Sequence, residues 1–156
     1  MTFERVLVAG AGQMGSGIAQ VVAASGRQVL LHDPYPGAVE RGLTGIGKSL
    51  ARLAEKGAGP EPAAVLARIA PVDGLQPADL MIEAIVEDRE AKEALFRAAD
   101  DALPPQAILA SNTSSIPITS LAAVTSRPDR VVGMHFFNPV PMLRLVEVIR
   151  ALQTSD

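Results

Sequence analysis

Histidine, the side chain best suited to move a proton at neutral pH, occurs only twice in this sequence, and the more informative one lies near its end. His135 lies in the segment Met134-His-Phe-Phe-Asn-Pro139, and Glu147 lies in the next apolar run. An unperturbed imidazole titrates near pH ~6.5 and can act as a general base, while a carboxylate behind it fixes the ring tautomer and stabilises the imidazolium. The hydroxyl of Ser114 could hold a substrate oxygen. These residues predict proton transfer at an alcohol; the alternatives are a solvated loop histidine and an exposed strand carboxylate.

A glycine-rich segment near the N-terminus has the spacing of a phosphate-binding loop. The apolar run Val6–Ala9 precedes it, and Met14–Ala24 has the pattern of a helix. In G-x-G-x-x-G, the first glycine permits a tight turn, the second lets the backbone approach a pyrophosphate, and the third lets helix and strand pack closely. The helix N-terminus adds free N–H groups and partial positive charge. We therefore predict a dinucleotide site at Gly10, Ala11, Gly12, Gln13, Met14 and Gly15.

An acidic residue after the second apolar run indicates which dinucleotide is bound. Asp33 follows the run Gln28–His32, and no cation follows in Pro34-Tyr-Pro36. A carboxylate at this place can accept hydrogen bonds from both ribose hydroxyls and would repel a 2′-phosphate. The sequence therefore predicts NAD rather than NADP, with a plain Asp33-Pro34 turn as the alternative. His32, inside the strand, is interpreted as structural.

Together with the histidine, a bound nicotinamide predicts an oxidoreductase. Oxidation of a secondary alcohol needs a base for the hydroxyl proton while hydride leaves for the ring. The run Ser111–Ser115 lacks the G-x-S-x-G elbow of a hydrolase, and it could also cap the following helix, Pro117–Val124. The chain has no cysteine, which excludes a disulfide, a thiolate metal site and a cysteine nucleophile. We expect no bound metal.

Length and charge exclude several kinds of partner. The 156 residues suit one domain, and a net charge of -3 without a basic block argues against nucleic acid or an anionic membrane as partner. No apolar run approaches the ~20 residues of a membrane span. The N-terminal segment Met1–Arg5 lacks a basic region followed by an apolar stretch, so we expect no signal peptide and a cytoplasmic location.

Strands that alternate with helices must position these side chains. Apolar runs predict further strands over 79–85, 107–110, 130–134 and 143–149, and helical periodicity predicts helices over 36–56, 62–69 and 88–103. In the last helix we expect Ala94, Leu95 and Ala98 to face inward. The alternation predicts an α/β fold, a doubly wound and mostly parallel sheet with helices on both faces, whose last strand is an edge or antiparallel strand. Residues 1–156 are expected to form one dinucleotide-binding domain.

Longer segments of the chain resemble one enzyme family. They are Gly10–Ala19, Glu83–Glu87, Ala110–Ile116 and Gly133–Met142, followed by Leu145–Ile149. Over nearly its whole length the chain resembles the N-terminal domain of the L-3-hydroxyacyl-CoA dehydrogenase family, which includes the 3-hydroxybutyryl-CoA dehydrogenases. The resemblance implies a Rossmann fold, NAD as cofactor, and interconversion of a 3-hydroxyacyl-CoA and a 3-ketoacyl-CoA.

The same resemblance implies a role for each matching residue. His135 would be the catalytic base, Glu147 its partner, and Ser114 a contact to the substrate oxygen and the nicotinamide. Asp33 would bind the adenosine ribose. The rest of the NAD site is implied at Glu87, Lys92 and Asn138, and coenzyme A contacts are implied at Ser49 and Lys56. A lysine there suits a phosphate of coenzyme A, although an exposed helix lysine is usually only solvated.

In one respect the sequence departs from the family. Its members continue into a helical domain that supplies dimer contacts, part of the acyl pocket and an asparagine of the active site, whereas this chain stops at Asp156. We expect NAD binding without that domain, weak or no turnover because substrate positioning is incomplete, and a homo-oligomer in full-length form through the missing domain. Two alternatives stay open: a non-catalytic NAD-binding or NAD-sensing module, and a dehydrogenase of the 3-hydroxyisobutyrate or phosphogluconate type.

Overall fold

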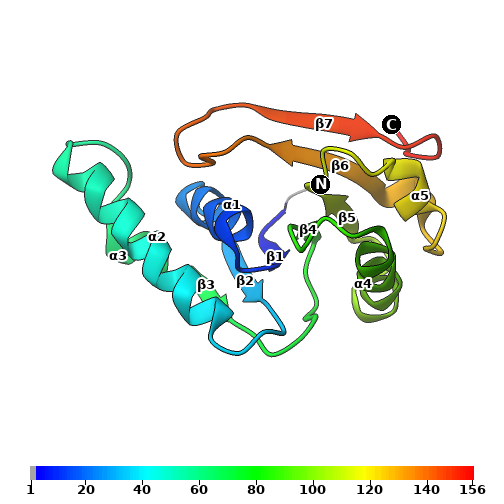
Figure 1. The fold of residues 1–156 in the computed structure, drawn as a ribbon, viewed down its shortest axis with the longest axis horizontal. Helices are drawn as coiled ribbons and strands as arrows, with labels where there is room; N and C mark the ends of the chain where they lie inside the picture. The colour runs from blue at the N-terminus through cyan, green and yellow to red at the C-terminus, as the bar shows by residue number, and fades with distance from the viewer. Residues whose placement is uncertain (1–2) are drawn as a thin grey trace.

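The aliphatic runs form the strands of a single sheet in the computed structural model, which describes residues 3–156. The strands are β1 (Arg5–Ala9), β2 (Gln28–His32), β3 (Ile69–Pro71), β4 (Leu80–Glu83), β5 (Ile108–Ser111), β6 (Val131–Phe136) and β7 (Val146–Arg150). They pair in the order β3-β2-β1-β4-β5-β6-β7, and every pair is parallel except β6 with β7 (Figure 1). Met1 and Thr2, part of the segment in which no signal peptide is expected, lie outside the described residues.

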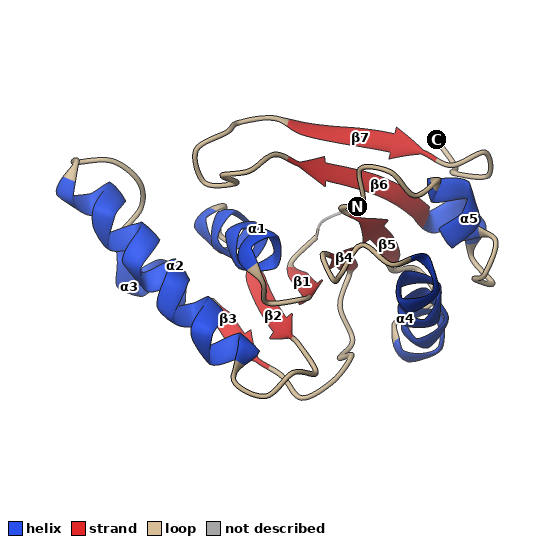
Figure 2. Ribbon diagram, viewed as in Figure 1, coloured by secondary structure: helices blue, strands red, loops and turns tan. Residues whose placement is uncertain are grey.

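Helices cover both faces of this sheet, as the alternation of elements predicts. They are α1 (Gln13–Ala24), α2 (Ala38–Glu55), α3 (Pro62–Leu66), α4 (Arg89–Ala102), α5 (Ile118–Ala122) and the short 3-10 helix η1 (Pro128–Arg130). Because side chains alternate along a strand, Val6 and Val8 of β1 pack in the apolar cluster that includes α1, α2 and α3. Leu7 and Ala9 pack with α4 and α5 on the opposite face. Figure 2 shows α1 and α2 on one side of the sheet and α4 and α5 on the other. The doubly wound, mostly parallel fold is confirmed.

The order of the strands fixes where a ligand can bind. The chain runs outward from β1 through β2 to β3, and then returns to the other side of β1 with β4. The loops after β1 and β4 therefore diverge to opposite faces, which opens a crevice at the carboxyl ends of the strands. The glycine loop follows β1, and the loops that carry Glu87 and Ser114 follow β4 and β5. All three loops consequently meet at one edge of the sheet.

Two predictions about the helices were wrong. The segment 62–69 is not one helix: α3 ends at Leu66 and Ile69 begins β3, which pairs with β2. In α4 the buried side chains are Lys92, Phe96 and Ala99 rather than Ala94 and Ala98, which are exposed; Leu95 is half-buried. Apolar periodicity does not identify a buried lysine, so the inward face was misplaced around the helix.

The C-terminal end of α4 is held by a nearly buried ion pair. The Arg127 guanidinium lies 2.6 Å from the Asp100 carboxylate and also donates to backbone carbonyls of Asp100, Leu103 and Pro104. Burial alone raises the pKa of Asp100, but the Ser126 N–H bond and the charge of Arg127 outweigh it, so its pKa is lowered. This pair ties α4 to the segment that leads through η1 into β6.

The last two strands form an antiparallel hairpin at the edge of the sheet. β6 extends through Phe136, so His135 lies within the strand and not after it, and β7 begins only at Val146. Register pairs His135 directly with Glu147. All residues of β7 are exposed to some extent, including Val148 and Ile149. Within 3–156, no helix is long and apolar enough to cross a membrane.

Candidate functional site

The glycines of the first loop are required for different geometric reasons. Gly10 has φ +106°, and a Cβ on it would lie 2.5 Å from the Ala84 carbonyl oxygen at the start of the neighbouring loop. A Cβ on Gly15 would lie 1.9 Å from the Gly10 carbonyl oxygen, so α1 approaches the loop too closely for any side chain. A Cβ on Gly12 would meet nothing within 4 Å. Space is therefore open over Gly12, where a ligand could approach the backbone.

The start of α1 presents unpaired backbone donors next to that space. Gly12 is the N-cap, no described side chain caps the helix, and no acidic residue lies in its first turn. The N–H groups of a first helical turn have no partner inside the helix, and together with the helix dipole they favour an anion. The loop therefore fits the pyrophosphate of a dinucleotide.

Asp33 is held in a fixed position at the end of β2. Its carboxylate accepts hydrogen bonds from the backbone N–H of Ala11 at 2.8 Å and of Tyr35 at 3.0 Å. It thus joins the glycine loop to the loop after β2, and each oxygen keeps a further lone pair for a ligand. The ring of His32 contacts the Val72 carbonyl oxygen at 3.2 Å, which fits the structural interpretation of that histidine.

Two cavities lie along the edge of the sheet. The first, of about 600 Å³, lies between α1, α2 and the 138–141 loop, and its lining includes Asp33 and Ser49. Lys56 is not among the residues that line it. That lysine is exposed at the C-cap of α2, roughly 10 Å along the axis from Ser49 at 1.5 Å per residue. The structure therefore brings Ser49, but not Lys56, to this cavity.

The second cavity, of about 410 Å³, contains most of the predicted chemistry. Its lining includes the predicted residues Met14, Glu87, Lys92, Ser114, His135 and Asn138. Asn138 also lines the first cavity, together with Gln13, and the Gln13 amide donates to the Asn138 side-chain oxygen at 3.2 Å. The residues that we expected for the adenosine and nicotinamide parts of one dinucleotide therefore lie in two adjacent cavities that share a wall.

His135 and Glu147 form the pair that the sequence suggested. The imidazole Nδ1 lies 2.8 Å from a Glu147 carboxylate oxygen, across the antiparallel pair β6–β7. The carboxylate can only accept, so Nδ1 carries the proton in the neutral ring and Nε2 is left with a free lone pair. The Phe137 ring lies 4.6 Å from the imidazole, centre to centre. A base with a fixed tautomer therefore lines the second cavity.

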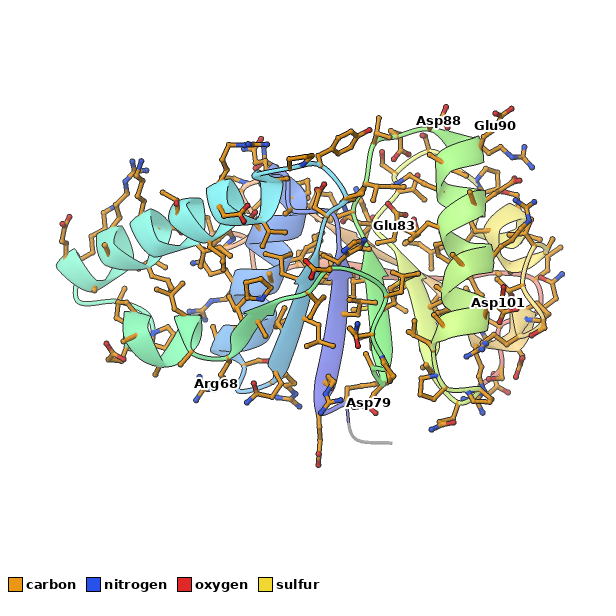
Figure 3. All side chains as sticks on the ribbon, turned by 90° about the horizontal axis from the view of Figure 1, so that it is seen from below. Arg68, Asp79, Glu83, Asp88, Glu90 and Asp101 are labelled. Atoms are coloured by element: carbon orange, nitrogen blue, oxygen red, sulfur yellow. The ribbon has the colours of Figure 1, made fainter. Side chains whose placement is uncertain are left out.

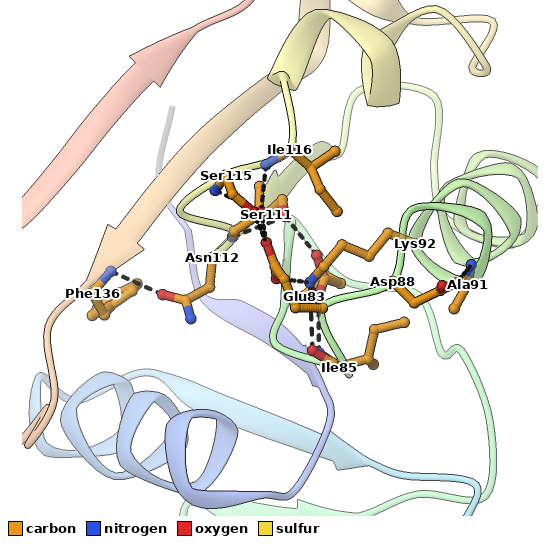
Figure 4. Close-up of polar contacts among 12 residues, drawn as sticks. Glu83, Ile85, Asp88, Ala91, Lys92, Ser111, Asn112, Ser115, Ile116 and Phe136 are labelled. Carbon is orange, nitrogen blue, oxygen red and sulfur yellow. Dashed lines mark hydrogen bonds and ion pairs between the residues drawn. The ribbon is translucent and has the colours of Figure 1, made fainter.

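A buried charge network beneath this cavity escaped prediction. Glu83 is fully buried at the end of β4, whereas Asp88 and Glu90 lie on the outside at the start of α4 (Figure 3). The Glu83 carboxylate lies 2.5 Å from the Lys92 ammonium, and it accepts from the Ser111 hydroxyl at 2.5 Å and from the Ile85 N–H at 2.7 Å (Figure 4). The network therefore fixes the loops after both β4 and β5.

Glu87 extends this network to the wall of the cavity. Its carboxylate lies 3.2 Å from the Lys92 ammonium and accepts from the hydroxyls of Thr113 and Ser115. Burial alone raises the pKa of Glu87, but these two hydrogen bonds and the charge of Lys92 outweigh it, so its pKa is lowered. Glu87 is consequently ionised near neutral pH.

Asn112 is a second residue that the sequence did not single out. Its side-chain oxygen accepts from the Phe136 N–H at 2.9 Å, next to His135 (Figure 4). Because a backbone N–H can only donate, the amide atom that it contacts is the side-chain oxygen of Asn112. The side-chain nitrogen of Asn112 has no hydrogen bond to any residue of 3–156. A polar side chain at the end of a buried strand was the available signal, directly after β5 for Asn112 and as the last residue of β4 for Glu83.

Comparison with known proteins gives this site a context. The family model described as 3-hydroxyacyl-CoA dehydrogenase, NAD binding domain, matches residues 5–156. A probable 3-hydroxybutyryl-CoA dehydrogenase of Bacillus subtilis is 52% identical over all of this chain and 56% of its own length. The mitochondrial hydroxyacyl-coenzyme A dehydrogenase of Sus scrofa is 42% identical over 98% of this chain and 52% of its own length.

Comparison with solved structures indicates the same family. The crystal structure of (S)-3-hydroxybutyryl-CoA dehydrogenase from Ralstonia eutropha has a TM-score of 0.95 and 46% identity, over 99% of this chain and 56% of that one. The chain thus spans about half the length of the relatives that it matches. The predicted family, fold and cofactor are confirmed, and a 3-hydroxyisobutyrate or phosphogluconate type of dehydrogenase is excluded. The chain belongs to the 3-hydroxyacyl-CoA dehydrogenase family, and its residues 5–156 match the NAD-binding domain of that family.

Proposed function

We propose that this domain serves an enzyme that interconverts a 3-hydroxyacyl-CoA and the corresponding 3-ketoacyl-CoA. The observation that carries the proposal is the His135–Glu147 pair, whose histidine lines the same cavity as Ser114. Relatives named for the four-carbon substrate support a short acyl chain. The residues around the glycine loop and Asp33 fit the cofactor.

Each protein group has a defined task in this proposal. NAD, when bound, supplies the hydride acceptor or donor for the carbon that carries the hydroxyl. His135 takes the hydroxyl proton at Nε2 in the oxidation and returns it in the reduction. Glu147 accepts the Nδ1–H bond and stabilises the imidazolium that forms. Ser114 holds the substrate oxygen, and Ser49 contacts coenzyme A in the first cavity.

The exposed surface of β7 supports a contact with a further domain. Apolar side chains gather there and beside it, including Leu145, which is 56% exposed, Val148 at 67% and Leu152 at 88%. Contiguous exposed apolar side chains mark interaction surfaces in soluble proteins. We propose that a helical domain covers this surface in the complete enzyme. The homo-oligomer, the coenzyme A contact of Lys56 and the cytoplasmic location stay predictions.

A binding experiment and an activity experiment test the proposal separately. A ligand that binds only the folded state raises the melting temperature, so NAD and NADH should stabilise the chain and NADPH should not. No response to either NAD or NADH would refute the binding part. In a version that carries a helical second domain, His135→Ala should abolish acetoacetyl-CoA reduction and leave NADH affinity nearly unchanged. Persisting activity would refute the assignment of the base. Activity that never appears, with or without a second domain, would instead favour a non-catalytic NAD-binding module.

A further inference from the structure

The charged groups around the second cavity do not cancel. Two carboxylates flank a single ammonium: Lys92 lies 2.5 Å from Glu83 and 3.2 Å from Glu87. His135, which also lines the cavity, already has Glu147 as its partner. Among the described lining residues there is no arginine and no second lysine. The ionised groups at this end of the site therefore have an excess of negative charge.

Glu87 is the member of this cluster that can act on a ligand. Its side chain is 45% exposed, whereas Glu83 is fully buried and Lys92 is 1% exposed. The Lys92 ammonium is shared with Glu83 at the shorter distance, so it neutralises Glu87 only in part. Hydroxyl groups of Thr113 and Ser115 donate to the Glu87 carboxylate and favour its ionised form. An incompletely neutralised carboxylate thus lines the cavity that contains His135.

We propose that Glu87 makes this site discriminate between the two redox forms of NAD by charge. The inference rests on the proposed function, because it requires the nicotinamide to lie in the cavity of His135. The oxidised ring carries one positive charge and the reduced ring carries none, while the phosphates are the same in both forms. The Glu87 carboxylate therefore stabilises bound NAD⁺ and leaves bound NADH nearly unaffected.

The size of the cavity bounds this effect. A sphere of 410 Å³ is about 9 Å across, so a ring inside it lies within roughly that distance of the Glu87 carboxylate. At an effective dielectric constant of about 20, one pair of unit charges at this separation changes a binding constant about 20-fold. Because the carboxylate is almost half exposed, solvent screening reduces the expected change to about fivefold or somewhat more.

The test compares the ratio of two dissociation constants, Kd for NAD⁺ over Kd for NADH, measured by calorimetry on this chain. Glu87→Gln should raise the ratio about fivefold, because it weakens NAD⁺ selectively. Glu87→Asp keeps the charge and should keep the ratio near its original value. Glu93→Gln is the matched control: it removes one negative charge from α4, at a residue that does not line the cavity and pairs with Arg89 and Arg97. Its ratio should not change.

A measurement on the unmodified protein covers the case in which the variant fails to fold. Salt screens the attraction between Glu87 and the oxidised ring, so the ratio should rise with ionic strength. A ratio that is unaffected by both Glu87→Gln and salt would overturn the charge mechanism and leave NAD binding intact. A chain that binds neither NAD⁺ nor NADH would instead refute the proposed function itself.

Discussion

Three glycine-to-alanine substitutions separate what the phosphate loop does for folding from what it does for NAD. Gly15→Ala places a Cβ 1.9 Å from the Gly10 carbonyl oxygen, whereas Gly12→Ala places one where no atom lies within 4 Å. Gly47→Ala serves as control, because this glycine lies inside α2, also with open space around its Cβ. We expect the first to impair folding, the second to impair binding, and the third to impair neither.

The magnitudes follow from these distances. The Gly15→Ala contact is more than 1 Å too short, so α1 must move away from β1, and overpacking of this kind costs about 1–3 kcal/mol or more. For a chain of this size that corresponds to a melting temperature roughly 2–12 °C lower. Gly12→Ala should cost at most about 1 kcal/mol of stability at this N-cap. Gly47→Ala should stabilise by about 0.5–1 kcal/mol, because alanine favours a helix interior over glycine.

The order of the three variants in NAD affinity should differ from their order in stability. A methyl group on Gly12 occupies the space that the pyrophosphate needs, and each lost hydrogen bond to a charged group is worth about 1.5–3 kcal/mol, so NAD affinity should fall at least about tenfold. Urea unfolding gives the stabilities, and calorimetric titration with NADH gives the affinities. The reasoning is refuted if Gly12→Ala binds NADH as tightly as the unmodified chain, or if Gly15→Ala unfolds at an unchanged urea concentration.

Other predictions concern ion pairs and a tautomer. The folded-state pKa of Asp100 lies below its ordinary 3.8, so this residue stabilises the fold above about pH 4, and its contribution is lost as the pH falls through the lowered pKa. Asp100→Asn should therefore flatten the acidic part of the plot of urea midpoint against pH. An unchanged slope there would contradict the prediction. Lys92→Met leaves Glu83 buried without its partner and should lower the free energy of unfolding by about 3–5 kcal/mol. The double variant Lys92→Met with Glu83→Gln should lose less, because no carboxylate is then left unpaired. Equal losses of the two variants in urea unfolding would argue against the pair. Neutral His135 should carry its proton on Nδ1 in ¹⁵N NMR spectra and lose that preference in Glu147→Ala.

Most of the fold could be predicted from the sequence because its signals are local and agree with one another. Apolar runs such as Val6–Ala9 are buried on both faces of a parallel sheet, and a break such as Gly26 follows the helix that covers them. The strand β3 was missed because it has three residues and shows no alternation of its own. This segment is a strand because its backbone pairs with the edge of β2, and that edge exists only once the sheet has assembled.

Residues of the candidate site could be predicted where the residue type at that position has one main chemical use. Asp33 and His135 were identified in this way, and they lie at the two cavities. Glu83 and Lys92 behave differently, because each side chain is stable in the interior only when the other is present. Glu83 sits nine positions before Lys92, on another element, and no local pattern states that they meet. Buried ion pairs of this kind are therefore the part that the sequence left open.

The antiparallel hairpin at the edge explains how a base can be held by a carboxylate at this end of the sheet. Parallel strands all end at the ligand edge, so the strand after β6 would begin at the far edge if it were parallel too. An antiparallel β7 instead starts at the ligand edge, which puts Glu147, its second residue, directly opposite His135. A shift of one residue in that register would turn the carboxylate to the other face. The reversal of one strand is thus what converts a dinucleotide-binding sheet into one that also positions an acid–base pair.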